Sequence, residues 1–298
     1  MTDILKHCTL CPRECGVNRY ESRGFCGEGS AVRIARAELH MWEEPCISGT
    51  RGAGTVFFSG CDLRCCFCQN YEISHLGKGF ELTADGLCEA FLRLRDMGAH
   101  NIDLVNPTHF LPQIIEALDR LGESLGIPVV YNSGGYDKPE SLELTRGRIS
   151  IFLPDLKYLD STAAAVYSGA ADYPERAFAA IHKMFELVGR PVFGEDGLMK
   201  SGVIVRHLIL PNHRKDSIAL LKRLSEEFDK GDILISLMSQ YTPVYKASEH
   251  PEISRRLSTF EYKTVMQALE QSGFDGYVQQ ASSASEEFIP AFYGEKYY

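Results

Sequence analysis

The most constraining feature of the sequence is a short loop that carries three closely spaced cysteines, Cys61, Cys65 and Cys68. The loop directly follows residues 55–59, an apolar run that predicts a buried strand. An ordinary 4Fe-4S cluster takes four thiolates, so a loop with three leaves one iron without a protein ligand and able to bind a substrate or cofactor. The loop therefore predicts an iron–sulfur centre with chemistry of its own.

The spacing Cys-x3-Cys-x2-Cys, with the aromatic Phe67 just before the last cysteine, resembles the signature of the radical S-adenosylmethionine (SAM) superfamily. A pairing that uses Cys66 in place of Cys65 breaks this spacing, so Cys66 is interpreted as a small buried residue. The alternative is a zinc knuckle built from Cys65, Cys66 and Cys68. It needs a fourth ligand in tetrahedral geometry and gives the preceding strand no role. The resemblance also implies that Phe67 lies near bound SAM.

A second group of cysteines stands near the N-terminus, in the order Cys8, Cys11, Cys15 and Cys26. Four thiolates this near one another can form a structural zinc site or hold an additional iron–sulfur cluster. Either metal would stabilise a segment that has little apolar periodicity. The loose spacing between Cys15 and Cys26 leaves a third interpretation open, four reduced thiols without a metal.

Composition narrows the function classes. A net charge of −9 argues against a phosphate-backbone binder, because such proteins concentrate Lys and Arg, so nucleic acid is not an expected partner. No apolar run approaches the ~20 residues of a membrane helix, so no membrane role is expected. The first eight residues have no apolar signal core, so the ten cysteines are interpreted as reduced thiols in a cytoplasmic protein.

After the three-cysteine loop, apolar runs alternate with helical patterns. The predicted strands are residues 102–105, 129–132, 151–156, 203–210, 233–237 and 276–279, and the predicted helices are residues 83–97, 110–121, 216–228 and 259–271. This alternation indicates an α/β fold with parallel strands and right-handed crossovers, either a wound sheet or a barrel. The resemblance to radical SAM enzymes implies a partial, open (β/α)6 barrel of the TIM type. We expect a small Cys-rich lobe in residues 1–53, the barrel in 54–245 and a helix-and-strand extension in 246–298.

Polar residues just after the strands are the candidate ligands, because barrels bind at the carboxyl ends of their strands. Asn106 and Thr108 follow the second strand, where radical SAM enzymes carry a Gly-Gly-Glu-Pro-like stretch that contacts the amine of SAM. This sequence departs from that stretch, and either residue can replace the contact or simply cap a helix. Ser133 lies in a loop that resembles the SAM-contacting loop of glycyl-radical-enzyme activases, although two following glycines are also typical of a turn.

Asp155 and Lys157 resemble the Asp-x-Lys element of the same activases, which lies near SAM and substrate. A buried ionised pair needs further partners, such as the charged groups of SAM, and the alternative is an ordinary edge ion pair. Arg206 suits bidentate capture of a carboxylate, and we favour it over His207 because the two point to opposite faces of a strand. Gln240 follows the sixth strand and is a candidate contact for adenine or substrate, with a polar turn as the alternative.

Within the superfamily, the sequence most resembles the pyruvate formate-lyase activating enzymes, specifically relatives with an N-terminal cysteine group. This resemblance implies a radical SAM oxidoreductase that cleaves SAM reductively and uses the 5′-deoxyadenosyl radical to abstract hydrogen, from a protein in the activases. It also implies a reducing partner of the flavodoxin or ferredoxin type. The alternatives are radical chemistry on a small molecule and a non-enzymatic iron–sulfur carrier. Neither an individual catalytic residue nor the substrate follows from the sequence.

Overall fold

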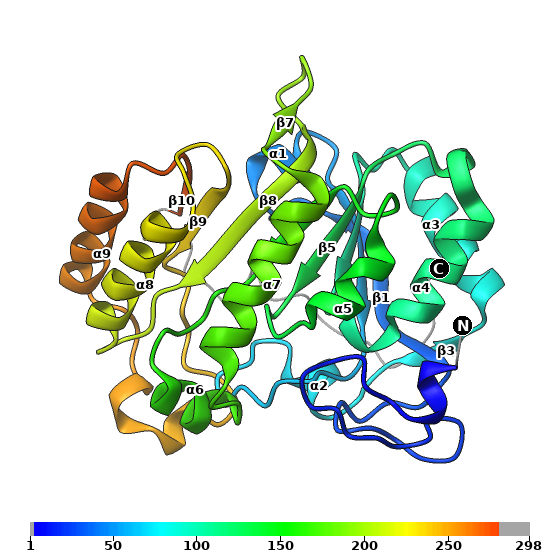
Figure 1. The fold of residues 1–298 in the computed structure, drawn as a ribbon, viewed down its shortest axis with the longest axis horizontal. Coiled ribbons are helices and arrows are strands. Elements are labelled where there is room, and N and C mark those ends of the chain that lie inside the picture. The colour runs from blue at the N-terminus through cyan, green and yellow to red at the C-terminus, as the bar shows by residue number, and fades with distance from the viewer. Residues whose placement is uncertain (1–2, 280–298) are drawn as a thin grey trace.

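The structure is a computed structural model and describes residues 3–279. The strands are β1 (Val32–His40), β2 (Ala53–Phe58), β3 (Phe80–Leu82), β4 (Ile102–Val105), β5 (Val129–Ser133), β6 (Ile151–Pro154), β7 (Val192–Phe193), β8 (Met199–Leu208), β9 (Leu234–Met238) and β10 (Gly276–Val278). They form one sheet in the order β10-β9-β8-β6-β5-β4-β2-β1-β3, with β7 paired to β8 (Figure 1). From β2 to β10 along this order the pairs are parallel, whereas β1, β3 and β7 pair antiparallel.

The sheet does not close on itself, because β3 and β10 are the two ends of the strand order among residues 3–279. This confirms the predicted open barrel of parallel strands. The sequence analysis did not predict β1, which pairs with β2 from Ile34 opposite Phe58 to His40 opposite Ala53. Residues 32–40, which lie in the segment expected as a small Cys-rich lobe, thus form a strand of the main sheet.

The helices are α1 (Pro45–Ser48), α2 (Tyr71–Ser74), α3 (Ala84–Asp96), α4 (Leu111–Leu121), α5 (Pro139–Leu142), α6 (Ser161–Ser168), α7 (Tyr173–Val188), α8 (Arg214–Glu227) and α9 (Thr259–Ser272). Figure 1 shows α3, α4, α7, α8 and α9 along one face of the sheet. The predicted helix at residues 83–97 begins as expected, because the Thr83 side chain accepts a hydrogen bond from Gly86 N. In the part of the chain that the structure describes, no helix is long and apolar enough to cross a membrane.

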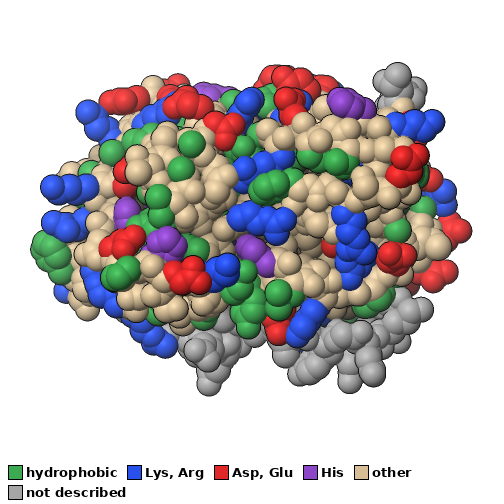
Figure 2. Space-filling view, turned by 90° about the horizontal axis from the view of Figure 1, so that it is seen from below, with side chains coloured by type: hydrophobic (Ala, Val, Ile, Leu, Met, Phe, Trp, Pro, Cys, Tyr) green, Lys and Arg blue, Asp and Glu red, His purple; other side chains and the backbone are tan. Residues whose placement is uncertain are grey.

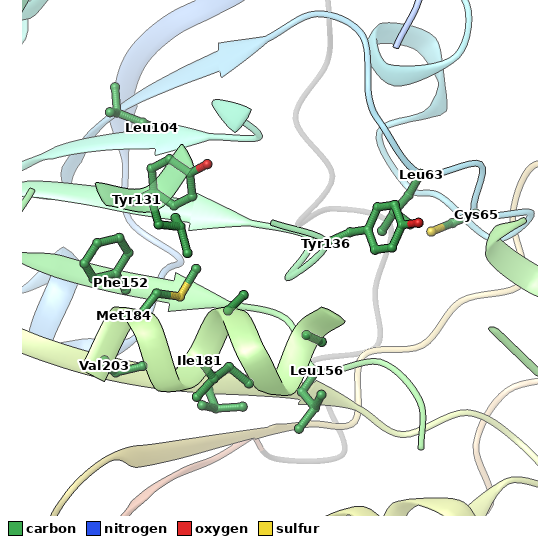
Figure 3. Close-up of a cluster of buried hydrophobic side chains, with 14 of the residues drawn as sticks. Leu63, Cys65, Leu104, Tyr131, Tyr136, Phe152, Leu156, Ile181, Met184 and Val203 are labelled. Atoms are coloured by element: carbon green, nitrogen blue, oxygen red, sulfur yellow. The ribbon is translucent and has the colours of Figure 1, made fainter. Parts of the chain in front are cut away.

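The large core lies between the sheet and these helices. Figure 3 shows Ile181 and Met184 of α7 beside Tyr131, Phe152 and Val203 of the strands, and all five side chains are buried. The sequence analysis did not predict α6 or α7. The three- to four-residue spacing of buried positions in α7 is the signal that would have revealed it.

A second, smaller core fills the opposite face of the sheet. It contains Val130 and Ile151 of the strands together with Cys46 and Ile47 of α1. Successive strand residues point to opposite faces, so the odd-numbered positions of β5 join the large core and the even-numbered ones face inward. Because α1 fills the inner face next to these buried strand residues, the space for a ligand lies nearer the carboxyl ends of the strands.

Residues 3–31 form the Cys-rich part of the chain, which Figure 1 shows at the same end of the sheet as α2. This segment is attached directly to the three-cysteine loop. Cys61 N donates a hydrogen bond to Cys26 O at 3.1 Å, and Arg13 Nε donates to Asp62 O at 2.8 Å. The N-terminal cysteines therefore lie next to the loop that the sequence predicts to bind the cluster.

Candidate active site

The three-cysteine loop begins two residues after β2 ends, and the surrounding backbone fixes its path. Gly60 has a φ of +80°, and a Cβ at this position would lie 2.7 Å from Cys26 O, so a larger residue cannot fit without a shift. Cys66 N donates to Tyr167 O at 2.8 Å, and Cys66 O accepts from Lys246 N at 2.8 Å. The N-terminal segment, α6 and the chain after β9 thus hold the loop from three sides.

The three thiols have defined polar neighbours. Cys65 Sγ lies 3.0 Å from Ser168 Oγ, and Cys68 Sγ lies 3.2 Å from Ser74 Oγ. Burial raises the pKa of Cys61, Cys65 and Cys68, the last to about 11. Bound iron would reverse this effect, because a coordinating thiol gives up its proton to the metal. The serine hydroxyls could then donate to two of the thiolates.

Three thiols on one loop are the donor set of a 4Fe-4S cluster with one iron left open. Within residues 3–279, no group of three or more His, Cys, Asp or Glu side chains is arranged to hold a metal ion. Three thiols on one loop, two of them facing a cavity, suit a cluster with one open iron.

The cavity beside the loop has a volume of about 310 Å³. Its lining includes five of the predicted SAM contacts, Phe67, Asp155, Lys157, Arg206 and Gln240. It also includes four residues that the sequence analysis did not select, Trp42, Glu43, Glu44 and Asn132. Asn132 could have been found from strand alternation. The other three follow β1, a strand that was not predicted.

Arg206 is the centre of a charged network in the cavity wall. Its Nε donates to Asp155 Oδ1 at 3.0 Å, its Nη1 to Glu43 Oε2 at 3.2 Å and its Nη2 to Asn132 Oδ1 at 2.6 Å. Lys157 Nζ donates to the other oxygen of Asp155 at 2.5 Å. We refer to Glu43, Asn132, Asp155, Lys157 and Arg206 as the cavity network.

Burial and neighbouring charges shift the pKa values of the cavity carboxylates in both directions. Burial alone would raise the pKa of Asp155, but Lys157 and Arg206 outweigh burial and hold that pKa below its usual value. Burial would likewise lower the pKa of Lys157, and the charge of Asp155 more than compensates. For Glu43 and Glu44, burial dominates over the attraction of Arg206 and raises the pKa. Added positive charge in the cavity would therefore stabilise these two carboxylates.

Two other predicted contacts do not line the cavity. Thr108 and Ser133 are buried, and their hydroxyls donate to Asp137 at 2.7 and 2.6 Å. Tyr131 donates to the same carboxylate at 2.8 Å. We refer to Thr108, Tyr131, Ser133 and Asp137 as the sealed network. Its hydroxyls are already used within the fold.

Asn106 occupies a third position, against the three-cysteine loop. Its φ is +59°, a conformation that Asn tolerates better than most residues. Its Nδ2 donates to Gly60 O, and Cys61 Sγ lies 3.7 Å from its Oδ1. Asn106 therefore contacts the loop and does not line the cavity.

The N-terminal cysteines lie in one part of the structure. Cys8, Cys11 and Cys26 are buried and Cys15 is exposed. A Cβ built on Gly24 would lie 3.4 Å from both Cys15 Sγ and Cys26 Sγ, so both sulfurs lie close to that glycine. Burial raises the pKa of Cys26 to about 11. As the side chains stand, these thiols are not arranged around a metal ion.

The structure is an open α/β barrel with a three-cysteine loop at the carboxyl ends of its strands. Comparisons with known proteins identify the family that has these features. Residues 55–200 match the sequence model of the Radical SAM superfamily. An uncharacterized protein of Methanocaldococcus jannaschii, MJ0674, is 30% identical over 285 residues, which cover 92% of this chain and 77% of that protein. A pyruvate formate-lyase-activating enzyme of Clostridium pasteurianum is 26% identical over 183 residues, which cover 60% of this chain and 71% of that one. The chain belongs to the radical SAM superfamily.

A solved structure agrees with the fold. Streptococcus suis SuiB, bound to its precursor peptide SuiA, matches with a TM-score of 0.52 at 15% identity, over 74% of this chain and 46% of SuiB. This chain therefore spans less than half the length of that protein, and the match shows the fold alone. Membership of the superfamily confirms the prediction of a radical SAM enzyme, a family that uses a 4Fe-4S cluster and SAM and needs a reductant.

Proposed function

We propose that this protein is a radical SAM enzyme of the activating-enzyme type, which uses a 5′-deoxyadenosyl radical to abstract hydrogen from a protein substrate. The observation that carries the proposal is the meeting of Cys65 and Cys68 with Asp155, Lys157 and Arg206 around one cavity. A bound 4Fe-4S cluster would supply the electron for the reductive cleavage of SAM. Similarity to a pyruvate formate-lyase-activating enzyme supports a protein as the substrate.

The charge of the cavity suits SAM, which carries an ammonium, a sulfonium and a carboxylate group. Glu43 and Glu44 can accept hydrogen bonds from an ammonium group, and the raised pKa of each falls when positive charge is added. Lys157 has N–H donors left beyond its bond to Asp155, and these can hold a carboxylate. Each nitrogen of the Arg206 guanidinium already donates within the cavity network, so Arg206 holds the acceptors in place.

The aromatic wall beside the cluster loop serves to exclude water. The Phe67 ring packs edge-on against Tyr241 at 5.7 Å and Tyr158 at 6.5 Å between centroids. All three side chains are buried. A primary carbon radical abstracts hydrogen from C–H and S–H bonds within its reach, so a wall that excludes solvent and its solutes keeps the radical for its substrate.

The ligand assignment is tested with two neighbouring cysteines as a matched pair. Anaerobically reconstituted Cys65→Ala should neither show the 4Fe-4S absorption spectrum nor release 5′-deoxyadenosine from SAM under reduction. Cys66→Ala should retain both, because Cys66 is fixed through its backbone. If Cys65→Ala is active and Cys66→Ala is not, the assignment is wrong.

The substrate class needs a separate experiment. The reconstituted enzyme, SAM and a reductant are mixed with a pyruvate formate-lyase-type glycyl-radical enzyme, and electron paramagnetic resonance is recorded. A protein-bound glycyl radical that needs SAM and the intact three-cysteine loop is the expected result. SAM cleavage without any radical on the partner would favour the alternative, radical chemistry on a small molecule.

We further infer that Cys8, Cys11, Cys15 and Cys26 hold a second metal, either zinc or an iron–sulfur cluster. The proximity of two of these sulfurs to Gly24 and the burial of three of the thiols support this inference. Metal would stabilise a segment with few apolar contacts. Metal analysis of a variant that lacks Cys61, Cys65 and Cys68 should still find about one metal centre per chain. Finding neither iron nor zinc in the folded variant would leave four free thiols.

The thiols and the proposed cluster also indicate the compartment and the reducing partner. All ten cysteines are free thiols, which suits a reducing compartment, and we infer a cytoplasmic location. A low-potential carrier of the flavodoxin or ferredoxin type would supply the reducing electron.

A further inference from the structure

A group of basic residues lies on the face of the molecule that carries the three-cysteine loop. Figure 2 shows Lys and Arg side chains gathered across the middle of this face, although the chain as a whole has a net charge of −9. Two exposed basic residues belong to the three-cysteine loop or touch it, namely Arg64 and Lys246. Both lie close enough to His75 to lower its pKa further, after burial, which is the larger cause.

Neither cation is neutralised by a carboxylate among residues 3–279. Arg64 donates to Phe25 O and lies over the Phe25 ring at 4.9 Å, and Lys246 lies 5.7 Å from the centre of the Tyr245 ring. Lys200, near the start of β8, shows the contrast, because its Nζ lies 3.5 Å from an oxygen of Asp196. Within the described part of the chain, the charges of Arg64 and Lys246 are therefore available to an external partner.

A short chain of contacts connects these cations to one of the predicted iron ligands. Cys68 Sγ lies 3.2 Å from Ser74 Oγ, which lies 2.8 Å from His75 Nδ1. The His75 ring is 5.0 Å from the ring of Tyr245, which stacks on Tyr71 at 4.8 Å with an interplanar angle of 12°. Two polar contacts thus separate the thiol from three aromatic rings that the solvent reaches in part.

We propose that the surface formed by Arg64, Tyr71, His75, Tyr245 and Lys246 is the docking site for an acidic one-electron carrier protein that reduces the cluster. The proposal rests on the proposed function. One electron leaves the reduced carrier and enters the cluster bound by the three-cysteine loop, so the carrier is oxidised by one electron and no bond or proton is exchanged. We refer to these five residues as the carrier surface.

Charge selects the partner. A protein of net charge −9 repels an acidic carrier at long range, so docking requires a local region of opposite sign. Arg64 and Lys246 supply it within reach of the cluster loop, and they would orient the carrier with its cofactor toward Cys68. The stacked Tyr71 and Tyr245 provide a flat aromatic contact at the centre of such an interface.

Binding is the first test. An acidic flavodoxin is titrated calorimetrically into wild type and the double variant Arg64→Glu and Lys246→Glu, at low and high salt. We expect wild type to bind at least tenfold more tightly at low salt and to lose this advantage as salt screens the charges. Lys200→Glu removes a cation near the start of β8, outside the carrier surface, and should bind like wild type. Equal affinity of the double variant and wild type would place the carrier elsewhere and overturn the proposal.

The rate of SAM cleavage with two different reductants separates an effect on carrier docking from an effect on the reaction itself. With flavodoxin as reductant, the double variant should release 5′-deoxyadenosine at least tenfold more slowly than wild type. With dithionite, a small reductant that needs no docking, the two should be equal. A loss with both reductants would overturn the carrier surface in favour of a role in cluster or SAM binding.

If wild type cleaves no SAM even with dithionite, the proposed function fails and the carrier surface with it. A double variant that binds the carrier normally but loses a substrate protein would assign this surface to the substrate.

Discussion

The cavity network and the sealed network share strand β5 and both draw on the carboxyl ends of parallel strands, yet only the cavity network lines an open space. In the cavity network, Asp155, Lys157 and Arg206 line an open space. In the sealed network, Asp137 takes three hydroxyl donors and is itself buried. Both networks follow strands, so position after a strand does not decide which polar group meets a ligand.

Strand alternation explains the difference. On β5, Asn132 points inward to the cavity and Ser133 points to the opposite side, where Asp137 accepts from it. On β8, Arg206 points inward and His207 outward, where its Nδ1 donates to Leu156 O at 2.7 Å. A polar residue is available to a ligand when its strand position faces inward and no acceptor within the fold already uses it.

The sealed network should matter for folding and little for binding. Asp137→Ala leaves three buried hydroxyls without their acceptor, and we expect the free energy of unfolding to fall by roughly 4 kcal/mol. SAM affinity of the folded protein should stay within about twofold of wild type, because Asp137 does not line the cavity. Urea unfolding and calorimetric titration of SAM measure the two quantities. A large loss of SAM affinity without loss of stability would place Asp137 in the binding site.

His207, the outward-facing residue of β8, should make the free energy of unfolding depend on pH. Burial lowers the pKa of His207 to about 4, against the pull of Leu156 O and Asp155, whereas the unfolded chain binds a proton near pH 6.5. The unfolded state therefore takes up protons first as the pH falls. The stability that neutral His207 contributes is complete above pH 6.5 and declines by about 3 kcal/mol toward pH 4.

The measurement is the free energy of unfolding by urea between pH 4 and 7.5. His207→Gln should flatten the slope, because Gln does not titrate. His182→Gln, which changes an exposed histidine of α7 paired with Glu227, should leave most of the slope in place. A slope that His207→Gln does not change would mean that other groups, such as the buried His109, control acid unfolding.

Strand alternation also explains how much of the fold and of the candidate site could be predicted from the sequence. The parallel strands were predicted because both of their faces are buried, so each is a continuous apolar run. Alternation correctly separated Arg206 from His207, and the same argument applied to β5 would have chosen Asn132 over Ser133. The pattern within β1 could not be assigned, because that strand pairs antiparallel across a bulge near Ile34 and Arg36. Without β1, nothing in the sequence placed Glu43 at the cavity.

Arg206, the inward-facing residue of β8, and its partner Asp155 should control SAM binding. Arg206→Ala leaves the partly buried Glu43 without its cationic partner, and Asp155→Ala leaves the partly buried Lys157 without its carboxylate partner. Each variant should bind SAM at least about a hundredfold more weakly, because an unpaired buried charge costs several kcal/mol. The cluster spectrum should stay intact, since neither residue is a thiolate ligand. Unchanged affinity in both variants would mean that the cavity network is structural, like the sealed one.

The smallest expected effect concerns Glu43, which reaches the cavity from the segment after β1, outside the residues that match the superfamily model. Burial raises the pKa of Glu43 although Arg206 lies beside it, so burial opposes the charged form of this carboxyl more than Arg206 favours it. Glu43→Gln keeps the shape and one acceptor oxygen for Arg206. We therefore expect SAM affinity to fall only about tenfold, roughly 1.4 kcal/mol.

Trp42, the single tryptophan of the chain, lines the same cavity, so its fluorescence during a SAM titration reports binding directly. Glu38→Gln on β1, which removes the ionised partner of Arg36, serves as the matched control and should bind like wild type. A hundredfold loss in Glu43→Gln would show that Glu43 is ionised when SAM is bound and belongs with Asp155 in holding its charge. No loss of SAM affinity at all would show that Glu43 only orients Arg206. A side chain that faces inward would then not have to be a ligand, just as a side chain that follows a strand does not have to be one.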